Sequence, residues 1–253
     1  MLGVYFSGTG NTRHCVEVFA AQYKSDSDVI SIEDSQVLSH IAKHDTLAIG
    51  YPVYFSNAPR IMQDFIAENG TYFRGKQVFV IATMGLWSGD GAGCAARLLK
   101  RHGARIIGGL HLRMPDCICD ERVLKKPGNA TYSLIQQAET KIAAAVRRLK
   151  NSEPTREGLS FPHRIAGLLG QRLWFYGKTK TYNQRPLVDT LRCNGCGLCA
   201  RLCPMKNLTI KDAKAEPSKR CTLCYRCANH CPTRALTILG RTVHAQYSFA
   251  DYE

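Results

Sequence analysis

The chain has 253 residues and a mass of 28.1 kDa, with 45% hydrophobic and 21% charged residues, which is an ordinary globular composition. This balance excludes a disordered or fibrous protein. The chain begins without a basic lead and apolar core, and no apolar stretch approaches the ~20 residues of a membrane span, so we expect a cytoplasmic protein with no such span. The net charge is +14, of which +10 lies after Thr155.

Over residues 1–151, short apolar runs alternate with helical patterns. Strands are expected at Leu2 to Phe6, Val29 to Ile32, Thr46 to Gly50, Val78 to Thr83 and Ile106 to Leu112. Helices are expected near 12–23, 34–42, 59–68, 91–102 and 132–149. Alternating strands and helices predict an α/β fold, in which helices cover both faces of a doubly wound, five-stranded parallel sheet.

Residues 152–186 are interpreted as a basic connector, with a helix expected within 159–176. Ten Lys and Arg residues occur between Lys141 and Arg185. They are consistent with a solvated helix face or with a docking surface for an acidic protein partner. The pattern alone leaves both interpretations open.

Eight of the 12 cysteines form two runs that repeat at an offset of 28 residues. The first run is Cys193, Cys196, Cys199 and Cys203 followed by Pro204, and the second is Cys221, Cys224, Cys227 and Cys231 followed by Pro232. Thiolates two residues apart can wrap an iron–sulfur cubane from a tight loop. Zinc ribbons usually use pairs of CxxC without the closing Pro, so the spacing favours clusters over zinc.

The array resembles the bacterial two-cluster ferredoxins over residues 187–240, which implies a small α+β domain with two [4Fe–4S] clusters. In that family, the fourth Cys of each run binds the other cluster. The resemblance implies that cluster I uses Cys193, Cys196, Cys199 and Cys231, and that cluster II uses Cys221, Cys224, Cys227 and Cys203. Tyr225 stands where the first run has Gly197, which leaves the ligands intact but changes the surroundings of cluster II.

A loop rich in hydroxyls and glycine follows the first expected strand and opens the first helix. Its residues are Ser7, Gly8, Thr9, Gly10, Asn11 and Thr12. Backbone N–H groups and the helix dipole make such a junction an anion site. The loop itself contains neither Gly-Lys-Ser/Thr nor GxGxxG, which argues against a nucleoside-triphosphate or dinucleotide loop. The loop resembles the phosphate loop of flavodoxins, which implies that it holds the phosphate of FMN.

Two further loops follow the third and fourth strands, beyond the carboxyl ends where ligands bind in open α/β sheets. The expected flavin contacts in them are Pro52, Val53, Tyr54, Phe55, Ser56 and Asn57, and then Thr83, Met84, Gly85, Trp87, Gly89 and Asp90. Tyr54 and Trp87 could stack on a flat ring, although packing elsewhere is as plausible for Trp87 alone.

The order and length of the two parts resemble a flavodoxin–ferredoxin fusion family of anaerobes, with residues 241–253 as a C-terminal tail. The implied cofactors are FMN and two [4Fe–4S] clusters. Their negative charge offsets part of the basic excess, so we expect no nucleic acid partner. The resemblance implies electron transfer with a protein redox partner. An FMN-dependent reductase of a small substrate and a redox-sensing module remain alternatives.

Four cysteines lie outside the array. Cys15 and Cys94 fall on expected helices, where buried structural roles are usual. Cys117 and Cys119 follow the fifth strand, and we expect them to serve packing or a loop next to the flavin. The eight His are scattered, and neither a catalytic triad nor HExxH is present.

Overall fold

The computed structural model describes residues 1–86, 89–122, 128–169 and 184–252. Five parallel strands form one sheet in the order β2-β1-β3-β4-β5, which is the flavodoxin-like order. This confirms the predicted sheet. The strands are β1 (Leu2–Tyr5), β2 (Val29–Ser31), β3 (Thr46–Pro52), β4 (Gln77–Met84) and β5 (Arg105–Arg113).

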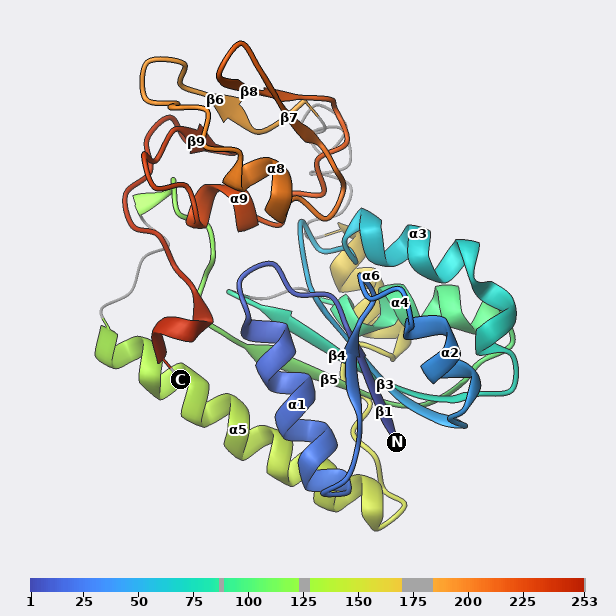
Figure 1. Cartoon of the computed structure of the whole chain (residues 1–253). Helices are drawn as coiled ribbons and strands as arrows, with labels where there is room; N and C mark the ends of the chain where they lie inside the picture. The colour runs from blue at the N-terminus through green and yellow to red at the C-terminus, as the bar shows by residue number, and fades with distance from the viewer. Residues whose placement is uncertain (87–88, 123–127, 170–183, 253) are drawn as a thin grey trace.

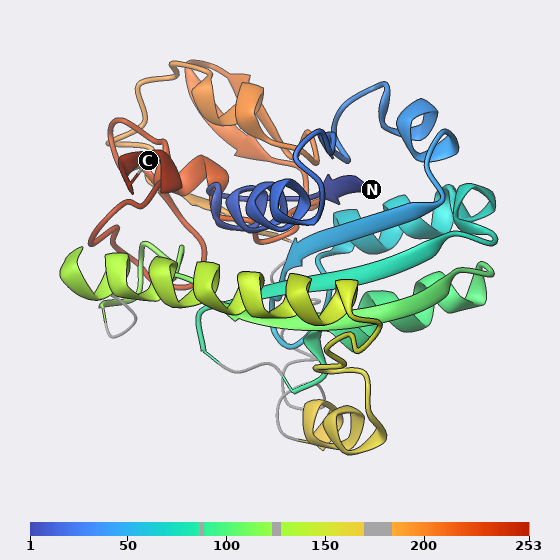
Figure 2. The ribbon, with the colours of Figure 1, turned by 90° about the horizontal axis from the view of Figure 1, so that it is seen from below.

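The central strands are buried on both faces because helices cover each side. The helices are α1 (Asn11–Tyr23), α2 (Val37–Ala42), α3 (Arg60–Glu68), η1 (Gly70–Phe73), α4 (Gly91–Arg101) and α5 (Gly128–Lys150). On β3, Leu47 and Ile49 face the core formed with α2, α3 and α4, whereas Ala48 faces α1 and α5. Figures 1 and 2 show α1 and α5 side by side.

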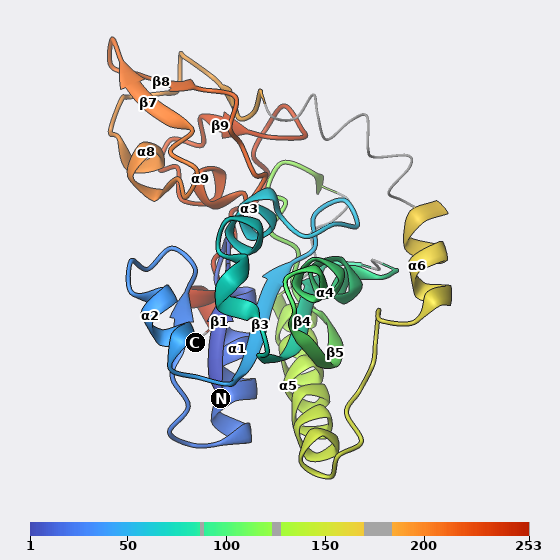
Figure 3. The ribbon, with the colours of Figure 1, turned by 90° about the vertical axis from the view of Figure 1, so that its right-hand side faces the viewer.

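The cysteine-rich region, residues 187–240, lies over the carboxyl ends of the sheet strands (Figures 1 and 3). It contains two antiparallel strand pairs and two short helices, which confirms the small α+β expectation. Its elements are β6 (Leu187–Val188), α8 (Leu198–Leu202), β7 (Leu208–Lys211), β8 (Lys214–Pro217), α9 (Arg226–Asn229) and β9 (Leu236–Thr237).

The segment between these parts packs on the free edge of the sheet. The Gly109 N–H donates to the Thr155 carbonyl, and the Glu157 N–H donates to the Gly109 carbonyl. The helix expected within 159–176 begins as α6 (Phe161–Gly167), which lies near α4 (Figure 3), and residues 170–183 lie outside the described residues. Within the described ranges, no helix is long and apolar enough to cross a membrane.

Candidate functional site

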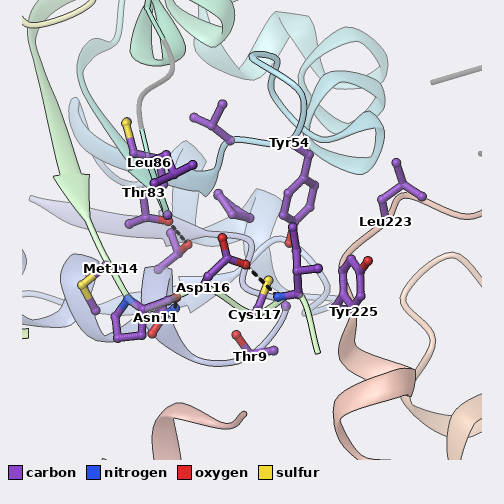
Figure 4. A pocket seen from close by; sticks show the side chains of 18 of the residues that line it. Thr9, Asn11, Tyr54, Thr83, Leu86, Met114, Asp116, Cys117, Leu223 and Tyr225 are labelled. Atoms are coloured by element: carbon purple, nitrogen blue, oxygen red, sulfur yellow. Dashed lines mark hydrogen bonds between the residues drawn. The ribbon is translucent and has the colours of Figure 1, made fainter. Parts of the chain in front are cut away.

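A large pocket opens at the carboxyl ends of the strands, where the flavin loops were predicted to meet. Its lining includes Ser7, Gly8, Thr9, Asn11, Thr12, Pro52, Val53, Tyr54, Phe55, Ser56, Thr83, Met84 and Gly85, all of them predicted site residues. Three chain segments distant in sequence therefore converge here. Figure 4 shows Thr9 and Asn11 at one side of the pocket and Tyr54 across from Thr83 and Leu86.

The loop of residues 7–12 bends so that the start of α1 faces the pocket. The Gly10 N–H donates to Ser7 Oγ at 3.1 Å, and Gly10 has φ 103°, a left-handed conformation that favours glycine. The first N–H groups of α1 have no acceptor within the helix. Thr12 and Thr83 join their hydroxyls at 2.7 Å, whereas no described residue hydrogen-bonds the Thr9 hydroxyl. The loop thus offers backbone and hydroxyl donors to an anion.

The loop after β3 is a tight turn closed by two bonds between Tyr54 and Asn57. Phe55 and Ser56, between them, both have φ near 50° (49° and 56°), a strained conformation for side chains other than glycine. The turn directs Tyr54 into the pocket (Figure 4), and burial raises the pKa of its phenol well above the usual range. The ring can therefore pack on a flat ligand as a neutral phenol.

The loop after β5 forms another wall, with Met114, Pro115, Asp116, Cys117 and Ile118 in the lining. The Asn11 side chain fixes this wall by donating to the Pro115 carbonyl at 2.8 Å. The Ile118 N–H donates to Asp116 Oδ1 at 2.8 Å, and Asp116 is the only carboxylate among the described lining residues. Cys117 belongs to the pocket, whereas Cys119 is buried in the core of the cysteine-rich region.

The cysteine-rich region closes the remaining side with Leu223, Tyr225, Ile238 and Leu239. Tyr225 Oη donates to Asp120 Oδ1 at 2.8 Å, and the N–H groups of Ile238 and Leu239 donate to Asp120 Oδ2. Through these bonds the buried Asp120, in the segment after β5, holds three of the four covering residues in place. Figure 4 shows Leu223 and Tyr225 at the end of the pocket opposite Met114. Sequence patterns alone did not reveal this cover.

The C-terminal tail also reaches the site. The Phe249 N–H donates to the Thr9 carbonyl at 2.8 Å, and Tyr247 Oη donates to Asn11 Oδ1 at 2.6 Å. Phe249 stacks on His14 of α1 with ring centroids 4.3 Å apart, and Tyr252 of η4 (Phe249–Tyr252) meets Tyr132 of α5. A side chain at Gly10 would collide with Phe249. The tail therefore braces the loop of residues 7–12 from behind.

Four of the predicted flavin contacts that the structure describes are not among the lining residues. Gly10 faces the tail, and Asn57 is used by its own turn, where Oδ1 accepts from the Ala58 N–H. Asp90, which directly precedes α4, is fully buried, and its carboxylate lies 2.7 Å from the Arg97 guanidinium. Gly89 adjoins Asp90 and also lies outside the pocket. Trp87 lies outside the described residues.

The four cysteines of the first set lie together, although they come from both runs of the repeat. Cys193, Cys196, Cys199 and Cys231 line one small cavity together with Ile210 and Leu236. Cys231 comes from the second run, as the crossed pattern implied. Within the described residues, no three His, Cys, Asp or Glu side chains are placed to hold a single ion.

The second set comprises Cys203, Cys221, Cys224 and Cys227. Burial raises the pKa of Cys227 well above its usual range, and the nearby thiols of Cys224, Cys221, Cys203 and Cys199 add to this rise. Burial raises the pKa of Cys221 to about 12 and that of Cys224 to about 11. Without metal these thiols stay protonated at neutral pH, and metal binding must displace the protons.

The backbone N–H groups that approach cysteine sulfurs also follow the 28-residue repeat. The Asn207 N–H lies 3.2 Å from Cys203 Sγ, and its counterpart 28 residues later, the Ala235 N–H, lies 3.3 Å from Cys231 Sγ. Gly197 and Tyr225, also 28 residues apart, both precede short helices in the left-handed conformation, with φ of 76° and 60°. Tyr225 accepts backbone strain that Gly197 avoids, at a position where its ring reaches the pocket.

The second cysteine run is docked on the loop of residues 7–12. Arg226 donates to the Ser7 carbonyl at 2.7 Å and to both carboxylate oxygens of Glu33 at 2.6 and 2.8 Å. A side chain at Gly8 would collide with the Cys224 carbonyl. Cys224 itself packs into the core shared with β3 and β4. The second cysteine set and the pocket are therefore neighbours.

Comparison with known proteins identifies two parts of the chain. The flavodoxin domain model matches residues 2–105, and the 4Fe-4S dicluster domain model matches residues 192–235. The chain thus joins a flavodoxin domain to a 4Fe-4S dicluster domain. This combination defines an electron-transfer flavo-iron-sulfur protein. The flavodoxin domain implies FMN, and the dicluster domain implies iron–sulfur clusters.

Solved structures that are similar to this chain include flavodoxins and a rubredoxin oxygen:oxidoreductase. A flavodoxin from the domain Archaea is 19% identical over 59% of this chain and 97% of its own, with a TM-score of 0.43. The flavodoxin of Megasphaera elsdenii is 22% identical over 57% of this chain and 100% of its own, with a TM-score of 0.41. Rubredoxin oxygen:oxidoreductase from Desulfovibrio gigas is 17% identical over 58% of this chain and 35% of its own, with a TM-score of 0.38. No curated protein matches the chain.

Proposed function

We propose that the chain binds one FMN in the large pocket and two [4Fe–4S] clusters in the crossed cysteine sets, and exchanges low-potential electrons with a protein partner. The domains would be residues 1–151 for FMN, 152–186 as connector, 187–240 for the clusters and 241–253 as the bracing tail. The observation that carries the proposal is the docking of the second cysteine run against the pocket. When bound, FMN exchanges one or two electrons and each cluster exchanges one.

The pocket residues divide into two groups with different tasks. The loop of residues 7–12 would bind the phosphate through the N–H groups of α1 and the Thr9 hydroxyl, without a Lys or Arg. Tyr54 and the apolar side chains of Met84 and Met114 would pack on the ring. Leu223 and Tyr225 would exclude water from the end that faces the second cysteine set.

The same cover argues against the reductase alternative. Hydride transfer requires that donor and acceptor atoms approach in near-contact geometry, and a nicotinamide would have to stack on an open ring face. Walls from the loops after β3, β4 and β5 and from the cysteine-rich region surround this pocket. The one carboxylate among the described lining residues, Asp116, accepts a backbone hydrogen bond, and neither Asp90 nor Asp120 is in the lining. The described part of the lining therefore offers no acid–base pair for substrate chemistry.

NADH or NADPH alone should therefore reduce the flavin slowly or not at all, whereas a low-potential one-electron donor should reduce it quickly. Anaerobic stopped-flow absorbance of the holoprotein tests this difference. Rapid bleaching by NADH that survives the loss of both clusters would instead support the reductase.

The Thr9 hydroxyl gives a test of the phosphate site. Thr9→Ala should weaken FMN binding by roughly tenfold to a hundredfold, because a hydrogen bond to a charged group contributes about 1.5–3 kcal/mol. Fluorescence titration of the apoprotein measures the affinity. The exposed Thr71 in η1 provides a matched control, and Thr71→Ala should leave the affinity unchanged. Equal affinities for Thr9→Ala and the parent chain would contradict this phosphate site.

A further inference from the structure

The two cysteine runs form two equivalent surfaces, and only the surface of the second run is covered by another part of the chain. In the second run, Thr222 accepts from the Ile61 N–H at 3.4 Å, Leu223 and Tyr225 line the pocket, and Arg226 binds the loop of residues 7–12. The four residues around Cys224 thus all face the part of the chain that carries the five-stranded sheet, called here the sheet domain. Cys224 is 7% exposed as a result.

The first run presents the equivalent positions outward. Asn194 and Cys196, the counterparts of Thr222 and Cys224, are exposed. Gly195 and Gly197 leave the backbone without side chains where the second run has Leu223 and Tyr225. The β7–β8 hairpin forms one wall of this face, because a side chain at Gly195 would collide with the Ala213 backbone. The hairpin lies on the side of the cysteine-rich region away from the sheet (Figures 1 and 3).

Apolar side chains accompany this open face. Leu191, two residues before Cys193, is 96% exposed, and Ile210 of β7 is 38% exposed although its repeat counterpart Ile238 is buried. Ile210 also lines the cavity of the first cysteine set. Exposed apolar groups next to a redox site are typical of a protein contact surface.

Cations surround the same face. Lys214 Nζ donates to the Cys193 carbonyl at 2.6 Å, and Arg201 donates to the Cys196 carbonyl at 3.3 Å. Over residues 187–240 there are nine Lys and Arg against three Asp and Glu, and of these bases Arg226 points inward to Glu33. The acids near the face are Asp189, which pairs with Arg192 at 3.4 Å, and Asp212 and Glu216 of the hairpin. The bases exceed the acids by six, and two bound clusters would offset about four of these charges, so the region as a whole keeps a positive charge that attracts an acidic partner.

We propose that a small acidic one-electron carrier protein docks on the face formed by Leu191, residues 193–198 and the β7–β8 hairpin, named here the outer face. It does so in the way that the sheet domain docks on the second run. In the exchange, a reduced carrier loses one electron and this chain gains one. The inference rests on the proposed function and adds to it the place of contact and the charge of the partner.

Binding of a small acidic two-cluster ferredoxin, with both proteins oxidised, tests the outer face without any turnover. Leu191→Glu combined with Lys211→Glu should weaken the affinity, measured by calorimetry at low salt, by at least about tenfold, because the change adds like charge and removes apolar contact. Tyr72→Glu combined with Lys100→Glu is a matched control, since it places the same charges on an exposed aromatic and an exposed lysine at the opposite end of the sheet. The control should change the affinity less than threefold.

Hydrogen exchange locates the contact independently. Adding the oxidised ferredoxin should protect amides within 191–216 and leave those of α5 and α6 unchanged. Equal weakening by both double variants, protection confined to α5 or α6, or no binding to the parent chain would each overturn the outer face. The proposed function is tested separately, by the cofactor content of the protein and by the reduction experiment with NADH.

Discussion

Replacing Arg226 with Met should release the cysteine-rich region from the sheet domain. The Arg226 side chain is 18% exposed, pairs with both oxygens of Glu33 and also satisfies the Ser7 carbonyl. Removing it leaves a partly buried carboxylate and a carbonyl unpaired. The docking free energy should fall by about 3 kcal/mol, toward the lower end for a broken buried pair because Glu33 keeps some solvent, so the undocked population should rise about a hundredfold.

Iodide quenching of the flavin fluorescence should detect this opening, and small-angle X-ray scattering should show a larger radius of gyration. Because Arg226 adjoins Cys227, Glu33→Gln provides a second variant that breaks the same ion pair from the sheet domain, and it should open the pocket in the same direction. Arg234→Met, at an exposed position of the cysteine-rich region, is the matched control. If both Arg226→Met and Glu33→Gln quench like the control, the ion pair does not hold the two parts together.

Single Cys→Ser variants should each remove one cluster, in a crossed pattern. The reconstituted holoprotein should contain about eight irons and about eight sulfides, and each variant should lose about four of each because a cubane missing one ligand is not retained. Cys196→Ser and Cys231→Ser should lose the same cluster, since these residues share one cavity. Cys203→Ser and Cys224→Ser should lose the other.

Iron and sulfide assays with EPR of the reduced protein distinguish the two clusters. The informative pair is Cys203→Ser and Cys231→Ser, because the two residues occupy equivalent positions in the repeat. If Cys231→Ser left the same EPR signal as Cys224→Ser, the ligand sets would be uncrossed. Zinc without acid-labile sulfide in the parent protein would contradict clusters altogether.

Local patterns predicted the parts of this molecule that depend on local physics. The buried strands, the amphipathic α5 and the cysteine runs carry their signals within a few residues, and so does the loop from Ser7 to Thr12. The loop from Met114 to Asp120 was noted through Cys117 and Cys119, but its Pro and Asp gave no indication of which groups would face a ligand. The flavin contacts expected at Asn57 and Asp90 were assigned from their positions after strands, and their own hydrogen bonds and ion pair turned out to decide where they lie.

The cover over the pocket could not be predicted in the same way, because it is formed by docking between segments more than 100 residues apart. Tyr225 illustrates the difficulty. The sequence showed that it replaces a glycine of the repeat, but its partner Asp120 lies 105 residues earlier in the chain. Similarly, Arg226 carried no signal beyond its charge, whereas it is a partly buried link to Glu33. A departure from an internal repeat was the one available signal for the contact.

The bonds from Phe249 to Thr9 and from Tyr247 to Asn11 have a consequence for biosynthesis. Residues 7–12 leave the ribosome early, yet the support behind them is translated about 240 residues later. The sheet can form first, but the loop acquires its final bracing only after translation has passed residue 249. Firm cofactor retention should therefore require residues 247–249 to be made, and a nascent chain stalled before residue 247 should release flavin faster than a chain that includes them.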